Sequence, residues 1–121
     1  MRIYTEQQIQ DTLKIVDSSI VNCEKVQPKL KESSPQLSLS HNRIKALYIA
    51  KTLLLGQESE FTTLELEEAT VQITSIKNKS TTGISNAKDG SATYTRFHKL
   101  ITAMDIVLDY LQKAKVETMK I

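Results

Sequence analysis

Residues 43–56 read RIKALYIAKTLLLG and form the most apolar stretch of the chain. Nine of these fourteen residues are apolar or tyrosine. On a helix, one broad arc collects the side chains expected to face a core: Ala46, Leu47, Ile49, Ala50, Leu53 and Leu54. The stretch therefore predicts a central helix of a bundle, which Gly56 ends in a left-handed conformation.

Three apolar residues of the same stretch lie outside this arc, with one lysine beside them: Ile44, Tyr48, Leu55 and Lys51. One explanation is that the chain before Ser40 folds over these residues, with Leu37 and Leu39 as a lid. The other is that they form a surface for a protein partner or for a second copy of the chain, because clustered exposed apolar residues more often mark contacts. The sequence leaves both explanations open.

Length and composition predict one helical domain over residues 1–121. The 121 residues include only three glycines and two prolines, which favours long helices over a turn-rich β fold. The single cysteine excludes an internal disulfide. We expect a cytosolic protein, because no apolar signal core begins the chain and no run of residues can span a bilayer. A net charge of +2 does not predict nucleic-acid binding.

Local signals predict four helices, over about 5–27, 36–55, 62–79 and 93–118. Pro28 should end the first helix, and Pro35 suits the first position of the second. Thr62 and Glu65 have the spacing of a capping box at the start of the third. The polar segment 80–92 predicts a mobile loop of thirteen residues. The expected fold is all-α, an antiparallel up-down-up-down four-helix bundle.

Helical periodicity also predicts the core. The residues expected to be mostly buried are Leu13, Val16, Ile20, Leu47, Leu54, Ile73, Ile101, Met104 and Leu108.

No constellation of residues predicts catalysis, a metal site or a cofactor site. Cys23 continues the apolar seam of the first helix and fits a small core residue. His98 shares a helical face with Asp105 and Asp109, but no second histidine stands four residues away, and no Glu-x-x-His pair is present. We therefore expect no enzyme activity and no bound metal or cofactor.

The charge pattern suggests two poles. Acidic side chains crowd into residues 58–68, at Glu58, Glu60, Glu65, Glu67 and Glu68. Six lysines flank the first and third connections and would form a basic pole if these connections share one end: Lys25, Lys29, Lys31, Lys77, Lys79 and Lys88. Helix dipoles alone would favour most of these positions, since acids suit helix starts and bases suit helix ends. They do not explain Arg96 and Lys99 in the first turns of the last helix.

Two functions from different classes remain. The first is a small bundle that binds another protein through its second helix, about residues 36–55, or through a charged pole. The second rests on a resemblance of size and architecture alone to bacteriocin-immunity proteins, with no matching motif. That resemblance implies a protein that engages a membrane-receptor complex, with the C-terminal residues 116–121 as a contact segment. An enzyme or a metal-binding bundle is the reading with least support.

Overall fold

The computed structural model describes residues 4–119, and within them the chain forms four long helices and no strand. These are α1 (Glu6–Val26), α2 (Pro35–Leu54), α3 (Thr63–Asn86) and α4 (Ala92–Met119), with a short 3₁₀ turn, Gln27–Lys29, after α1. The predicted all-α four-helix bundle is confirmed. Residues 116–119 of the suggested C-terminal contact segment belong to α4, and residues 120–121 lie outside the described part.

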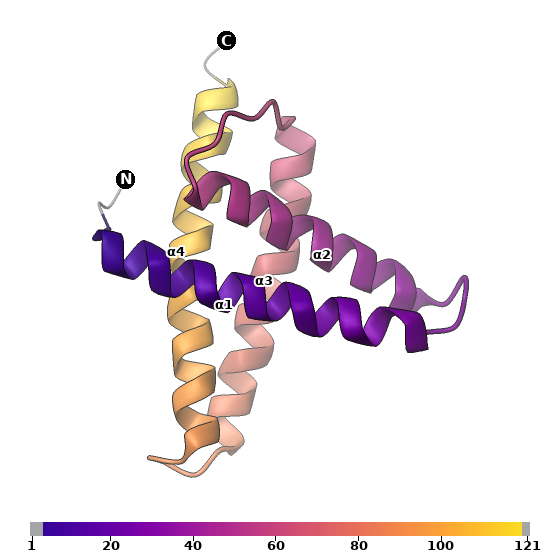
Figure 1. The fold of residues 1–121 in the computed structure, drawn as a ribbon, viewed down its shortest axis with the longest axis vertical. Coiled ribbons are helices and arrows are strands. Elements are labelled where there is room, and N and C mark those ends of the chain that lie inside the picture. The colour runs from indigo at the N-terminus through magenta and orange to yellow at the C-terminus, as the bar shows by residue number, and fades with distance from the viewer. Residues whose placement is uncertain (1–3, 120–121) are drawn as a thin grey trace.

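The helices are arranged as two hairpins that cross (Figure 1). Helices α1 and α2 run in opposite directions and make one hairpin, and α3 and α4 make the other. Helix α2 packs against both helices of the second hairpin, and α1 packs against α4. The hairpins thus meet over their central parts, and each extends beyond the crossing.

The helix boundaries follow the local sequence signals. Thr5 caps α1 through a capping box with Gln8, and Thr62 caps α3 through a capping box with Glu65. Ser34 caps α2, whose first residue is proline. At the other end of α2, Gly56 takes a φ of +69° and ends the helix, a conformation that glycine adopts without steric cost.

The core lies where the two hairpins cross. Six of the predicted core residues are buried: Val16, Ile20, Leu47, Leu54, Ile73 and Met104. The other three, Leu13, Ile101 and Leu108, are only partly buried. Helix α4 instead buries a neighbouring arc made of Ala103, Ile106, Val107 and Leu111, because α1 and α2 cross over that side of it.

The predicted loop at 80–92 is wrong for its first seven residues, because α3 continues to Asn86. Their hydroxyl groups bond to backbone carbonyls one turn earlier, as with Ser80 Oγ to Ile76 O at 2.8 Å and Thr81 Oγ1 to Lys77 O at 3.0 Å. Ser80 is also buried. Packing against α4 thus outweighs the weak helix propensity of this segment, and the connection shrinks to residues 87–91.

Candidate interaction surfaces

The predicted partner surface lies on the outside of α2 and is open. Tyr48 is 45% exposed and Leu55 is 48% exposed, while Ile44 and Lys51 are partly exposed. The lid explanation fails, because residues 35–39 are the first turn of α2 itself and cannot fold over its later turns.

An ion pair fixes one side of this surface. Lys51 Nζ lies 2.8 Å from Asp17 Oδ1 on α1. The hydrogen bond to Asp17 and the charge of its carboxylate raise the pKa of Lys51, so this side chain is cationic at neutral pH. Sequence reasoning found Lys51 but missed Asp17, because the pairing depends on the register between α1 and α2.

The surface continues onto α1 through Val21, which is 47% exposed. Val21 stands one turn after Asp17, so both side chains lie on one side of α1. Farther along the hairpin, Gln27 Nε2 donates to His41 Nδ1 at 2.8 Å. Since the contacts Asp17–Lys51 and Gln27–His41 bracket Val21, this valine lies beside the middle of α2 and widens the apolar area there. We call Ile44, Tyr48, Lys51, Leu55, Asp17 and Val21 the Tyr48 surface.

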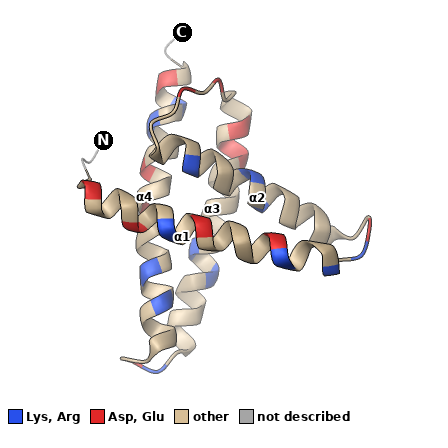
Figure 2. Cartoon of the chain, viewed as in Figure 1, with Lys and Arg blue, Asp and Glu red and all other residues tan. Residues whose placement is uncertain are grey.

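The six lysines of the predicted basic pole are not brought together at one end. Because the hairpins cross, the connection between α1 and α2 and the connection between α3 and α4 lie at different extremities of the molecule (Figure 1). Figure 2 shows acidic residues beside the lysines of the first connection. In the second hairpin, acidic residues occupy the start of α3, whereas basic residues lie on the second half of α3 and near the start of α4, with further basic residues near the end of α4. The charge separation is thus a property of one hairpin.

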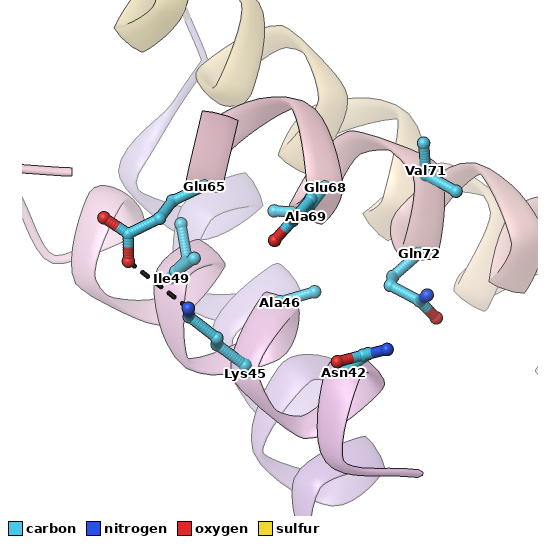
Figure 3. A pocket seen from close by; sticks show the side chains of 9 residues that line it. All are labelled: Asn42, Lys45, Ala46, Ile49, Glu65, Glu68, Ala69, Val71 and Gln72. Atoms are coloured by element: carbon cyan, nitrogen blue, oxygen red, sulfur yellow. Dashed lines mark ion pairs between the residues drawn. The ribbon is translucent and has the colours of Figure 1, made fainter. Parts of the chain in front are cut away.

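A small pocket of about 230 Å³ lies between α2 and the acidic start of α3 (Figure 3). Lys45 Nζ and Glu65 Oε2 pair across it at 3.4 Å. The backbone hydrogen bond from Thr62 lowers the pKa of Glu65, and Lys45 adds to this effect. Gln72 Oε1 is buried in the pocket wall without a hydrogen-bond partner among the described residues. The pocket offers polar contacts but no nucleophile with an adjacent base.

Two larger hollows lie where α1 crosses α4, of about 450 and 490 Å³, and they share Ile15 and Lys99. Apolar side chains from both helices contribute to their walls, and Lys14, Arg96 and Lys99 surround them. Asp11 is the acid that lines them. We call this region the basic hollow.

The two aspartates considered beside His98 have partners elsewhere in the fold. Asp105 pairs with Lys77 at 2.6 Å, and Asp109 accepts a hydrogen bond from Tyr4. Within residues 4–119, no group of three His, Cys, Asp or Glu residues could hold a metal ion. Cys23 packs beside the core, and its burial raises the pKa of the thiol. Little of this side chain is therefore ionised to the reactive thiolate at neutral pH.

None of the helices in the described part of the chain is long and apolar enough to cross a membrane. No protein-family model, no curated protein and no solved structure matches this chain.

Proposed function

We propose that the protein acts by binding another protein through the Tyr48 surface, without catalysis of its own. The observation that carries the proposal is an exposed apolar face on α2, the most apolar helix, with Tyr48 at its centre and Leu55 seven residues on. The cytosol remains the location that we propose.

The chemistry of this surface suits a protein contact. Tyrosine is enriched in binding hot spots, because its ring contributes a large apolar area while its hydroxyl group stays hydrated or finds a partner. The Lys51–Asp17 pair lies at the edge of the apolar area, an arrangement typical of a polar rim around an interface centre. Burial of Tyr48 and Leu55 in a complex would contribute a few kcal/mol to the free energy of binding, at about 1.5–3 kcal/mol for each fully covered apolar side chain.

The experiment uses Tyr48→Glu, with Leu39→Glu as its matched control. Leu39 is 41% exposed, close to the exposure of Tyr48, and stands nine residues earlier on α2, which places it on the opposite side of the helix. Each purified protein is immobilised and exposed to lysate of its native cell, and captured proteins are identified by mass spectrometry. Light scattering on the same samples reports a homodimer.

We expect both variants to stay folded, because an added carboxylate at an exposed site remains hydrated. Tyr48→Glu should lose the captured partner, or the dimer, which the wild-type protein and Leu39→Glu retain. If Tyr48→Glu stays folded and its capture and mass equal those of the wild type, the Tyr48 surface is not the binding site.

A further inference from the structure

From the charges on α1, α3 and α4 we infer that two copies of this protein associate head to tail, with an acidic stripe on α3 of one copy seated in the basic hollow of the next. This contact uses neither Tyr48 nor its neighbours, so it does not depend on the proposed function.

The acidic stripe consists of Leu64, Glu67, Glu68 and Val71. Residues at these spacings share one side of a helix. Leu64 is 63% exposed and Val71 is 65% exposed, more than any other leucine or valine among the described residues. Within residues 4–119, neither Glu67 nor Glu68 forms an ion pair. The stripe therefore presents two free carboxylates between two exposed apolar side chains.

The basic hollow has the complementary composition. Ile15, Phe97 and Leu100 are partly buried apolar residues in its walls. The three cations around it, Lys14, Arg96 and Lys99, form no ion pair within the described part of the chain.

Helix dipoles do not account for two of these cations. Helix α4 begins at Ala92, so Arg96 and Lys99 stand in its second and third turns, beyond the first turn over which the helix dipole acts. Arg96 lies over the Phe97 ring, with its guanidinium carbon 5.8 Å from the ring centroid. An arginine held against an aromatic face beside an apolar wall is a suitable partner for a carboxylate that brings its own apolar neighbour.

The stripe and the hollow of one molecule cannot reach each other. Phe97 packs against Gly83, which marks the level of the Arg96 end of the hollow along α3, and the Lys77–Asp105 ion pair marks the level of its other end, near Ile106. Glu67 stands sixteen residues before Gly83 and ten before Lys77, or about 24 Å and about 15 Å along the helix at 1.5 Å per residue. Both distances exceed the screening length of about 10 Å at 0.1 M salt. The two surfaces can therefore pair only between molecules, and because they are different surfaces the contact is heterologous and can repeat from copy to copy.

The first measurement is sedimentation velocity of the wild-type protein over a range of concentrations. At low ionic strength, near 0.01 M, the average mass should rise with concentration well above the monomer mass of 13.6 kDa. At about 1 M salt, where the screening length is about 3 Å, the mass should return to that of the monomer. A mass of 13.6 kDa at every concentration in low salt would overturn the proposal.

Two neutralised variants test the pairing. The stripe variant carries Leu64→Ala, Glu67→Gln and Glu68→Gln. The hollow variant carries Lys14→Gln, Arg96→Gln and Lys99→Gln. Each variant alone should associate at least about tenfold more weakly than the wild type, because it lacks one side of the contact. An equimolar mixture should form a dimer and nothing larger, because only one intact stripe and one intact hollow remain per pair.

A mixture that stays monomeric would overturn the proposal, and so would unchanged association in both variants. The control for net charge is a third variant with Lys25→Gln, Lys29→Gln and Lys31→Gln. It removes the same number of positive charges from the end of α1 and the first connection, outside the residues that line the hollow, and should associate like the wild type. If this control associates as weakly as the hollow variant, total charge explains the loss, and the head-to-tail contact is wrong.

Far-UV circular dichroism checks that each variant is folded. If truncation of Leu64 unfolds the stripe variant, the double variant Glu67→Gln, Glu68→Gln replaces it.

Tyr48→Glu separates this contact from the Tyr48 surface. It should leave head-to-tail association intact. If Tyr48→Glu abolishes all self-association, the copies meet through α2 instead, and the head-to-tail contact is excluded.

Discussion

Gly83 on α3 and Phe97 on α4 approach so closely that a Cβ atom at position 83 would lie 2.6 Å from the Cζ atom of the Phe97 ring. The absence of a side chain at Gly83 lets the ring lie against the α3 backbone. This contact joins α3 and α4 next to the place where α1 crosses α4, since Phe97 also lines the hollow beside α1.

Gly83→Ala should therefore destabilise the protein, although glycine to alanine inside a helix ordinarily stabilises by about 1 kcal/mol. Displacement of the ring should cost about 1–3 kcal/mol, as overpacking generally does. We expect a net loss of up to about 2 kcal/mol in the free energy of unfolding, measured by urea denaturation. In a Phe97→Leu background the same substitution should be neutral or stabilising, since the ring is gone. Stabilisation by Gly83→Ala in the wild-type background would contradict the contact.

Leu47→Ala and Leu108→Ala should differ in their cost. Leu47 has no exposed surface, and its truncation should cost about 2–5 kcal/mol through lost burial and a remaining cavity. Leu108 is only partly buried, so the gap left by its truncation opens toward solvent and costs less. Equal losses in chemical denaturation would show that the second hairpin is covered more fully than the structure indicates.

Glu65 should make the stability of the protein depend on pH. Its pKa is lowered in the folded protein, first by the backbone hydrogen bond at Thr62 and further by Lys45. The ordinary pKa of a glutamate carboxyl group is 4.5. Because the pKa of Glu65 is lower in the folded than in the unfolded state, its ionised form stabilises the fold at pH values above 4.5. This stabilisation is lost as the pH falls through the pKa of the folded state. Glu65→Gln keeps the side-chain length and an acceptor for the capping box but cannot ionise. The wild type should thus be the more stable protein at neutral pH, and the difference should vanish in acid; a difference that is constant with pH would contradict the shift.

Trypsin should cut after Lys88 long before it cuts after Lys79. Both lysines are exposed, but Lys88 lies in the connection at residues 87–91, whereas Lys79 lies inside α3. Cleavage needs local unfolding, which costs little in a short exposed loop and more in a packed helix. Mass spectrometry of the first fragments checks the order. Early cleavage at Lys79 would mean that residues 80–86 form a loop in solution, as the sequence alone predicts.

The positions of the helix ends could be read from single short segments. Thr62 with Glu65, Ser34 with Pro35, and Gly56 act on backbone groups within a few residues of themselves, so their effect does not depend on the rest of the fold. The open face of α2 was also visible in the sequence, because Tyr48 and Leu55 fall outside the arc that faces the core. The contribution of Asp17 to this surface was not visible, because it requires the register between two helices.

The sequence by itself determined four helices, most of their boundaries and the residues of the central core, since hydrogen bonds and helical periodicity are local. Only the tertiary structure decided that α3 continues through residues 80–86, where packing against Phe97 outweighs polar residues that favour a loop. It also decided how the two hairpins cross, because periodicity specifies which side of a helix is apolar but not the angle at which two apolar sides meet. That crossing places the first and third connections apart and leaves acidic and basic surfaces at the two ends of the second hairpin.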